Sequence, residues 1–255
     1  MFCVKKGFLL KISGAVTLVA GGCGSLGLSI AEYLHAAGAK VVLVDRDGEA
    51  LAHLPEIFGR RKADLADPGA ARAAAQSVAE EYGGINILIN AAGAIVSESF
   101  VNILNPESMM LSYERFRAGL AANLDTVFIM TSAVVEQMVL RRAKGVIISL
   151  SSICACGNEG QTAYSAAKAA VNAMTVTWSK ELGRFGIRCN AVAPGFIDTL
   201  STRAALNESQ IKHIVTETPL RRMGLPLEVA KGIATLIEND FLTGVILPVN
   251  GGLTL

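Results

Sequence analysis

Short apolar runs alternate with longer amphipathic segments along this chain of 255 residues. The runs are rich in β-branched residues and nearly free of polar positions, which is typical of strands buried on both faces of a parallel sheet. Strands are expected at 15–20, 40–45, 85–90, 145–150, 187–193 and 245–249. Helical spacing predicts helices at 25–37, 67–82, 113–141, 162–183, 208–214 and 226–238.

The order of these elements predicts the fold class. Strands that alternate with helices indicate an α/β protein with a Rossmann-type, doubly wound parallel sheet and helices on both of its faces. No linker, repeat or low-complexity tract interrupts the pattern, so residues 1–255 are expected to form a single domain. In such sheets ligands bind at the carboxyl ends of the strands.

Composition narrows the range of functions. The chain is 51% hydrophobic and 18% charged, with a formal net charge of +1. It can fill a core, but it lacks the clustered basic residues that nucleic acid binding requires, and neither nucleic acid nor membrane partners are expected. No stretch is expected to reach the length of a membrane span. The three histidines lie far apart, so no metal site is expected.

The cysteines indicate a reducing compartment. They are odd in number and have neither disulfide nor zinc spacing: Cys3, Cys23, Cys154, Cys156 and Cys189. A cytoplasmic location is therefore expected. Lys5 and Lys6 precede an apolar run, which leaves an organellar address as the open alternative.

A glycine-rich turn, AGGCGSLG, follows the first expected strand. Glycines there let backbone N–H groups approach a pyrophosphate at the start of a helix, although such turns also occur for packing reasons. Asp45 ends the second strand, where a carboxylate can bond both ribose hydroxyls and repel a 2′-phosphate. This favours NAD over NADP. Arg46 argues the other way as a phosphate partner, and a plain turn role for Asp45 is the remaining alternative.

The segment QTAYSAAK, residues 161–168, places Tyr164 and Lys168 four residues apart, hence on one helix face. A tyrosine that exchanges protons near neutral pH needs its pKa lowered from about 10 to about 7, which corresponds to about 4 kcal/mol. An ammonium ~4 Å away at an effective dielectric of ~20 supplies about that much. A packing tyrosine beside a solvated lysine explains neither the partner nor the spacing.

Two more polar residues join this pair. Ser151 lies thirteen residues before Tyr164, at the end of an expected strand, where its hydroxyl would face the ligand side. Asn123 lies within a long expected helix, a disfavoured place in which an asparagine is more often a surface residue. The four residues together are more specific than any one of them.

The chain resembles the short-chain dehydrogenases/reductases over essentially its whole length. The matching segments are GGCGSLG, ADLAD at 63–67, NAAG at 90–93, Asn123, Ser151, YSAAK at 164–168, APGFIDT at 193–199 and VNGG at 249–252. The resemblance implies an oxidoreductase whose one domain binds a dinucleotide and carries out catalysis.

The resemblance also implies a role for each catalytic residue. Tyr164 would exchange a proton with the substrate oxygen, and Ser151 would hold that oxygen. Lys168 would lower the tyrosine pKa and bind the nicotinamide ribose, while Asn123 would support a water-linked proton relay. The residues implied to contact the cofactor are Gly21, Gly24, Ser25, Leu26, Gly27, Asp45, Asp64, Leu65, Asn90, Ala91, Gly93, Tyr164, Lys168, Pro194, Gly195, Ile197 and Thr199.

Two positions depart from the family pattern. Ala20 stands where the family has threonine, and Ser25 stands at the middle glycine, with Gly24 one place earlier. A serine there is expected to cap the helix, so a working turn with altered cofactor affinity is expected.

Two subgroups look nearest. PGFIDT and VNGG are similar to 3-oxoacyl thioester reductases, whereas 94–120 and IENDFLTG look like NAD-dependent type II 3-hydroxyacyl-CoA dehydrogenases, which also oxidise hydroxysteroids. Asp45 favours NAD-dependent oxidation of a secondary alcohol, with a short 3-hydroxyacyl-CoA as the leading substrate. NADPH-dependent reduction, hydroxysteroid oxidation and a non-catalytic dinucleotide-binding regulator are the alternatives. The resemblance further implies a homo-oligomer, a tetramer formed through the long helices.

Overall fold

The computed structural model describes residues 10–95 and 97–255. Cys3, Lys5 and Lys6, used above for the choice of compartment, lie outside these residues. Within the described ranges, one sheet of seven parallel strands has the order β3-β2-β1-β4-β5-β6-β7. The strands are β1 (Val16–Ala20), β2 (Lys40–Asp45), β3 (Gly59–Lys62), β4 (Ile87–Asn90), β5 (Gly145–Leu150), β6 (Ile187–Pro194) and β7 (Ile246–Val249).

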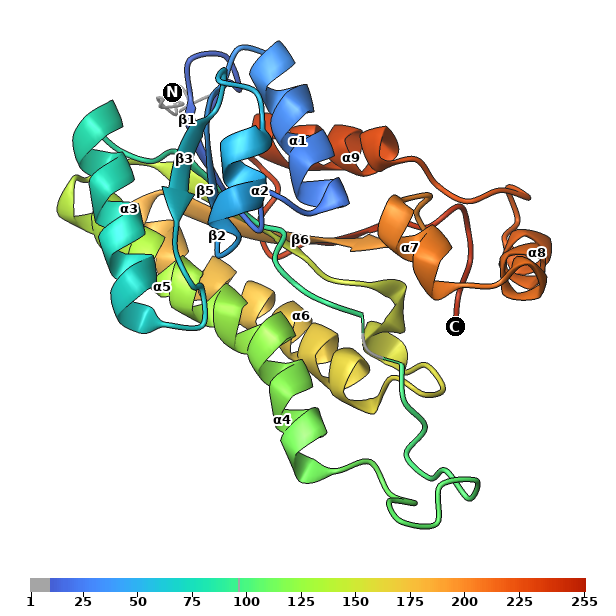
Figure 1. Ribbon diagram of the computed structural model, residues 1–255. Coiled ribbons are helices and arrows are strands. Elements are labelled where there is room, and N and C mark those ends of the chain that lie inside the picture. Colours follow the sequence, from blue (N-terminus) through green and yellow to red (C-terminus); the bar gives the residue numbers. More distant parts are fainter. Residues whose placement is uncertain (1–9, 96) are drawn as a thin grey trace.

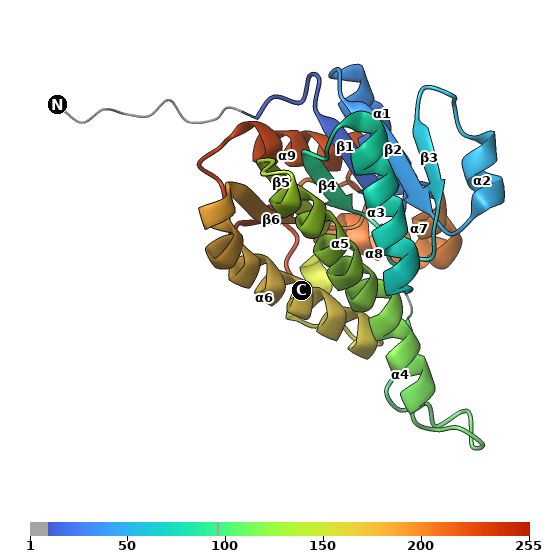
Figure 2. The same ribbon diagram turned by 90° about the vertical axis from the view of Figure 1, so that its left-hand side faces the viewer.

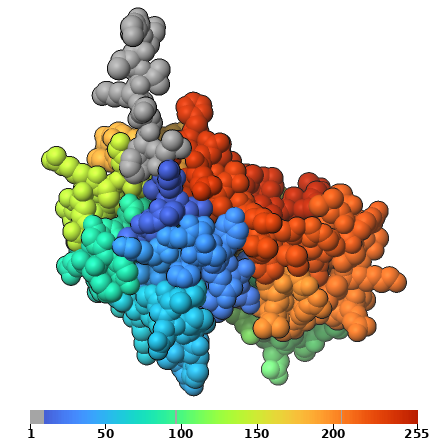
Figure 3. All heavy atoms as spheres, turned by 90° about the horizontal axis from the view of Figure 1, so that it is seen from above, coloured from blue at the N-terminus to red at the C-terminus, as the bar shows by residue number. Residues whose placement is uncertain are grey.

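Helices cover both faces of this sheet, so the expected doubly wound α/β fold is confirmed. α1 (Ser25–Ala36) and α9 (Pro226–Glu238) pack on one face and lie side by side in Figure 3. α3 (Pro68–Tyr82), α5 (Thr126–Leu140) and α6 (Thr162–Leu182) cover the other face (Figures 1 and 2). Shorter helices in the described part of the chain are α2 (Gly48–His53), α4 (Tyr113–Leu120), α7 (Leu200–Ala205) and α8 (Glu208–Glu217).

The unbroken apolar runs of the sequence follow from this two-sided burial. Neighbouring residues of one strand point into different cores: Val19 joins the cluster under α1 and α9, whereas Leu18 joins the cluster under α3 and α5. Both side chains are fully buried. Burying one such side chain stabilises the fold by about 1.5–3 kcal/mol, so either face of a central strand is costly to make polar.

The strand order reverses between β1 and β4, the neighbours at the centre of the sheet. The chain leaves β1 toward β2 and β3 on one side and leaves β4 toward β5, β6 and β7 on the other. Loops that depart in opposite directions open a crevice at the carboxyl ends of these two strands, which is where ligands bind in doubly wound sheets.

One long helix runs from Tyr113 to Leu140 and consists of α4, a π-helical turn at Ala121–Asp125 and α5. Its length and mean hydropathy of 1.5 would suffice to cross a membrane, against the expectation that no stretch is long enough. The helix packs against α3 and α6 within the fold, as helices of an α/β layer do. The length of this helix is therefore not evidence for a membrane span.

Residues 97–112, called the arm below, project beyond the start of α4 in both ribbon views (Figures 1 and 2). The two sides of the arm pair with each other: Val101 and Met110 form an antiparallel bridge, and the Leu111 N–H donates to the Phe100 carbonyl at 2.9 Å. The arm thus has a defined backbone structure.

Candidate active site

The glycine turn is shaped so that two positions accept no side chain. Gly21 has a φ of 80°, and a Cβ on it would lie 2.5 Å from the Ala92 nitrogen. A Cβ on Gly27 would lie 2.2 Å from the Gly21 carbonyl oxygen. Helix α1 therefore begins directly against the loop that follows β4.

The expectation that Ser25 caps α1 is wrong. Gly24 is the N-cap residue, without a side-chain cap bond, and Ser25 is the first helical residue. Leu26 follows it, half-buried against the core under α1. The first backbone N–H groups of α1 accordingly receive no side-chain acceptor at the cap, and such groups are ready donors for an anionic oxygen.

Asp45 lies at the carboxyl end of β2 and contacts the glycine turn. Its Oδ2 accepts the Cys23 N–H at 3.0 Å, and its Oδ1 accepts the Asp47 N–H at 3.1 Å. Burial, and then Asp45, raise the pKa of the Cys23 thiol to about 11. Arg46 is exposed next to this carboxylate. Asp45 thus combines a fixed position at the turn with a negative charge at the sheet edge.

Residues that follow β3 and β4 border the same crevice. Asp64 is exposed and Leu65 buried, immediately after an Ala63 N–H that donates to the Asp45 carbonyl at 2.9 Å. Asn90 ends β4, and its side-chain amide donates inward to Thr131 and Ser149. Ala91, one residue later, is half-buried.

Asn123 sits in the π-helical turn, which rotates its amide out of the regular helical pattern and into the protein. Its Nδ2 donates to the carbonyls of Ala94 at 2.9 Å and Gly119 at 3.0 Å, and its Oδ1 accepts the Ala94 N–H at 3.2 Å. π turns of this kind are frequent at functional sites. Asn123 therefore clamps the loop after β4 onto the long helix.

Gly93 joins this clamp to Lys168. A Cβ on Gly93 would lie 2.7 Å from Asn123 Oδ1 and 3.6 Å from Lys168 Nζ. Gly93 itself is exposed, whereas Asn123 and Lys168 are buried. The loop after β4, the π turn and helix α6 consequently meet at one point.

Tyr164 and Lys168 lie on one face of α6, as their spacing predicts. Lys168 Nζ is 5.5 Å from the centre of the Tyr164 ring and donates to the Leu150 carbonyl at 2.8 Å. That carbonyl is the last of β5, so the ammonium is tied to the carboxyl edge of the sheet. Gly119 allows the approach of α4, since a Cβ there would lie 2.7 Å from the Ala163 Cβ, next to Tyr164.

The expected lowering of the tyrosine pKa is not found. Burial raises the pKa of Tyr164 to about 12, although a hydrogen bond with the Ser152 side chain lowers it in part and the Cys154 thiol raises it again. Burial likewise lowers the pKa of Lys168 to about 8. Burial is the largest cause of both shifts.

Two neighbouring serines, Ser151 and Ser152, follow the end of β5. Ser151 lies on the side of its strand that faces α6, and its hydroxyl points to the Lys168 carbonyl oxygen at 3.5 Å. The neighbouring Ser152 hydroxyl accepts the Cys154 N–H at 3.1 Å, and its side chain lowers the pKa of Tyr164 in part. Counting thirteen residues back from Tyr164 selects Ser151. Ser151 and Ser152 are therefore both candidates for the hydroxyl that holds the substrate oxygen.

The segment after β6 closes the site on its remaining side. Pro194 ends β6, and the Gly195 N–H donates to the Val249 carbonyl at 3.0 Å. Ile197 is buried, and the Thr199 hydroxyl caps α7 by accepting the Thr202 N–H at 3.1 Å. Since β5 and β6 are neighbours, this segment lies beside the end of β5.

Fold and site together define a doubly wound α/β protein with a tyrosine, a lysine and a serine hydroxyl gathered at the carboxyl edge of its sheet. The family model described as Enoyl-(Acyl carrier protein) reductase matches residues 21–254. A (3R)-3-hydroxyacyl-CoA dehydrogenase of Canis lupus familiaris is 32% identical, over 96% of this chain and 98% of that protein. A 3-oxoacyl-(acyl-carrier-protein) reductase of Vibrio cholerae is 33% identical, over 96% of this chain and 99% of that protein.

A solved structure of a dehydrogenase is also similar to this chain in its three-dimensional fold. A 7α-hydroxysteroid dehydrogenase complexed with NADH and 7-oxo glycochenodeoxycholic acid matches with a TM-score of 0.87 and 26% identity, over 96% of each chain. The chain belongs to the short-chain dehydrogenase/reductase family, and the resemblance drawn from its motifs is confirmed. It is accordingly an oxidoreductase that acts on hydroxyl and keto groups.

Proposed function

We propose that the protein interconverts a secondary alcohol and a ketone with NAD as its cofactor. The observation that carries this proposal is that Tyr164 and the buried Lys168 ammonium lie together at the carboxyl end of β5, where the Ser152 side chain lowers the pKa of Tyr164 in part. A hydroxyl pair of this kind can hold a substrate oxygen between two donors and pass a proton to it.

The residues around the crevice fit a dinucleotide. Gly21 and Gly27 leave no room for side chains at the turn, and α1 begins at Gly24 without a side-chain cap. This suits a pyrophosphate at the helix N-terminus. Asp45 would bond the adenosine ribose hydroxyls, and its charge would repel the 2′-phosphate of NADP. When bound, the dinucleotide supplies or accepts the hydride and, in its oxidised form, adds a positive charge.

The protein's own residues would handle the proton. With a pKa of about 12, Tyr164 is protonated at neutral pH and is ready to donate to a carbonyl oxygen. Ser152 would donate a second hydrogen bond to that oxygen. Lys168, whose pKa is about 8, can exchange a proton near physiological pH. Asn123 would hold the loop that carries Gly93, because all of its bonds go to backbone groups nearby.

We propose a short 3-hydroxyacyl-CoA and its 3-oxoacyl counterpart as the substrate pair. Curated relatives that share about a third of the sequence carry the names of a 3-hydroxyacyl-CoA dehydrogenase and a 3-oxoacyl thioester reductase. The hydroxysteroid dehydrogenase with its bound oxo-steroid favours a sterol as the second candidate. Reduction of a 3-oxoacyl thioester, with NADPH in place of NAD, is a further candidate, and the name of the bacterial reductase favours its substrate.

We further propose a homo-oligomer, in the form of a tetramer, that uses the outer face of α5. Phe128, Ser132, Val135 and Val139 follow at helical spacing on this face, and Phe128 is 54% exposed. No charged residue belongs to this stripe, so a protein surface suits it better than water. A cytoplasmic location is in keeping with the free cysteines among the described residues.

The test is a turnover assay of 3-hydroxybutyryl-CoA, a 7α-hydroxysteroid and 2-propanol with NAD and with NADP. The proposal expects the CoA ester with NAD to give the highest kcat/KM and the Tyr164→Phe variant to be inactive. Faster turnover of the steroid would replace the substrate, and faster turnover with NADP would reject the role given to Asp45. Equal, negligible turnover of the parent and the Tyr164→Phe variant would indicate a non-catalytic regulator.

A further inference from the structure

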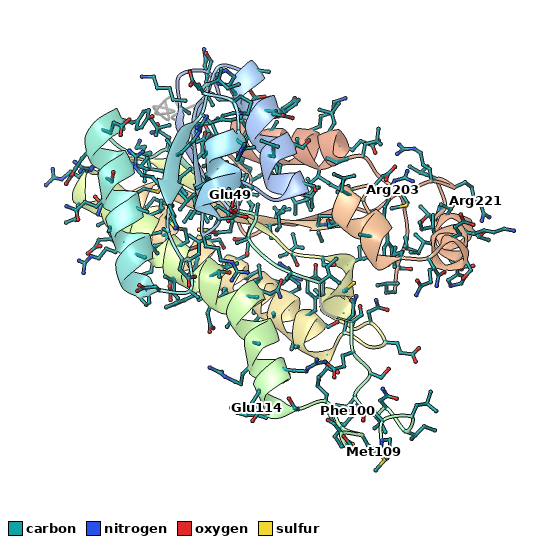
Figure 4. All side chains as sticks on the ribbon, in the orientation of Figure 1. Glu49, Phe100, Met109, Glu114, Arg203 and Arg221 are labelled. Atoms are coloured by element: carbon teal, nitrogen blue, oxygen red, sulfur yellow. The ribbon has the colours of Figure 1, made fainter. Side chains whose placement is uncertain are left out.

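The arm carries large apolar side chains that contact little of the protein's own surface. Figure 4 shows Phe100 and Met109 at the far end of the molecule from the sheet. Ile103 is 77% exposed and Leu104 is 89% exposed. The exposed apolar residues of the arm, called the arm patch below, are Phe100, Val101, Ile103, Leu104, Met109 and Met110. Soluble monomers rarely expose such a contiguous patch unless it meets a partner.

The arm is held in place at its base. The Glu98 N–H donates to the Gly160 carbonyl at 2.6 Å, and the Glu98 carboxylate pairs with Arg115 at 2.7 Å. The Gln161 amide donates to the Ser97 hydroxyl at 3.2 Å. These anchors belong to the loop before α6 or to α4, so the patch is presented at a fixed place relative to the long helix.

The long helix also exposes apolar residues at the end far from the arm, the C-terminal end of α5. Leu140 is 71% exposed and Val139 is 37% exposed at the last turn of α5. The 28 residues from Tyr113 to Leu140 span roughly 42 Å, so the arm patch and this end of α5 are too far apart to touch within one chain. Each is an apolar surface left open to solvent by the described residues of its own subunit.

We propose that the arm patch packs against the C-terminal end of α5 in a second copy of this chain. A twofold axis perpendicular to the long helix sets two copies antiparallel, so that each arm meets the other subunit's Val139 and Leu140. Both contacts then form at once, and the uncharged α5 stripe lies between them. This inference rests on the homo-oligomer proposed above and adds the arm as the partner of the last residues of the α5 stripe.

The charges near the arm favour a protein partner over a membrane. Loops that insert into anionic membranes are flanked by free lysines and arginines. Here Arg115 already pairs with Glu98, and the remaining nearby charges, Glu107, Glu114 and Arg117, are acidic on balance. Figure 4 places Glu114 at the start of α4, beside the arm. A lipid surface would gain little attraction from this set.

The first experiment replaces Ile103 and Leu104 together by glutamate and measures the molar mass by sedimentation velocity over a range of concentrations. The proposal expects the dissociation constant of the antiparallel pair to rise about tenfold or more, because a charge would be buried at the apolar contact. The control is Ile57→Glu, which changes another exposed apolar residue (55%) between α2 and β3 and should leave the association unchanged. Circular dichroism verifies the fold of both variants.

The second experiment locates the contact directly. Leu104→Cys and Leu140→Cys are introduced into separate chains, each with Cys156→Ser, and the chains are mixed with a short bis-maleimide. The proposal expects a covalent dimer in the mixture and little of it from either chain alone. Flotation with vesicles of neutral lipid, and of neutral lipid with phosphatidylserine, tests the membrane alternative.

The outcomes separate the two proposals. A parent chain that is monomeric at every concentration would overturn both the oligomer and the arm contact, while the turnover assay still decides the enzymatic function. An oligomer that the Ile103 and Leu104 substitutions leave intact would overturn the arm contact alone. Vesicle binding that these substitutions abolish, with the oligomer unchanged, would assign the arm patch to a membrane instead.

Discussion

The Lys168 ammonium lies over the face of the Tyr164 ring, 5.5 Å from its centre, while it donates to the Leu150 carbonyl. Burial raises the pKa of Tyr164 to about 12, and the Ser152 side chain lowers it only in part. The phenol is therefore protonated at neutral pH and suited to donate to a carbonyl. Oxidation of an alcohol would require the tyrosine pKa to fall, and the positive charge of an oxidised nicotinamide acts in that direction.

Ser152 is expected to contribute more to catalysis than Ser151. Ser152→Ala removes the hydroxyl that meets Tyr164 and should lower kcat/KM by about 10²- to 10³-fold. Ser151→Ala removes a hydroxyl that points to the Lys168 backbone and should lower it by less than about tenfold. Steady-state kinetics of the two variants and Tyr164→Phe provide the comparison. A larger loss of kcat/KM in Ser151→Ala than in Ser152→Ala would instead assign the catalytic hydroxyl to Ser151, which the thirteen-residue spacing selects.

The stability of the protein is expected to depend on pH through Lys168. Its pKa falls from 10.5 to about 8 on burial, so between these values the unfolded chain binds more protons than the folded one. Stability therefore rises with pH across this window, and below it the buried charge costs about 3 kcal/mol.

The Lys168→Met variant removes this cost. The free energy of unfolding of this variant should exceed that of the parent by the largest amount at pH 7. This difference should shrink as the pH approaches 10. Urea unfolding at several pH values measures the difference. A difference that stays constant with pH would show that the amine is neutral, or well solvated, throughout.

Gly93→Ala should impair catalysis more than folding. The added Cβ would lie 2.7 Å from Asn123 Oδ1, so the clamp between the loop and the long helix must shift. A displacement of the site by a fraction of an ångström is expected to lower kcat by about 10- to 100-fold.

Gly183→Ala is the control, because a Cβ there meets nothing within 4 Å and its backbone is helical. That variant should be active and slightly more stable, by about 0.4–1 kcal/mol. Equal activity of both variants would contradict a tight clamp.

Asp45→Asn is expected to change the choice of cofactor. The substitution removes the charge but keeps an oxygen that can accept one of the two backbone N–H groups, so the turn should persist. Relief of the repulsion should raise kcat/KM for NADP relative to NAD by about tenfold or more, the equivalent of about 1.4 kcal/mol. Asp64→Asn, a neighbouring exposed acid, is the matched control. An unchanged ratio in Asp45→Asn would place the discrimination elsewhere.

Arg188→Met should destabilise the fold without reaching the active site. This half-buried guanidinium donates to three backbone carbonyls at and just beyond the end of α9, and it pairs with Asp240 at 3.4 Å. Its loss removes this donor from the Leu236 and Ile237 carbonyls, while the Leu242 carbonyl still accepts from the Asn190 amide. The free energy of unfolding should fall by about 3 kcal/mol. Thermal unfolding measures the change. Arg184→Met, an exposed cation over the Phe185 ring, should leave the melting temperature nearly unchanged.

Much of the fold was predictable because most strands are buried on both faces. The run at 40–45 became β2 and the run at 145–150 became β5, with the same boundaries. β3 was not expected, because its sequence GRRK carries no apolar pattern, as suits the edge of a sheet. The six-residue helices α2 and α7 are too short to show a helical period.

The site was predictable in its membership but not in its contacts. A spacing of four places Tyr164 and Lys168 together whatever the rest of the fold does. Whether a hydroxyl at 151 or at 152 meets the tyrosine depends on how the chain turns after β5, which neighbouring serines do not reveal. The tyrosine pKa depends on burial and on the direction of the ammonium, and neither is encoded in the spacing.

The π turn at Ala121–Asp125 has a consequence for the evolution of this chain. One extra residue in a helical turn rotates everything before it by about 100°. Deleting a single residue there would restore a regular helix, swing the arm to another side of the molecule and withdraw the Asn123 amide from its loop. Insertions and deletions between the base of the arm and Asn123 should consequently be poorly tolerated. Catalysis and the contact with a second copy thus constrain the same short stretch of sequence.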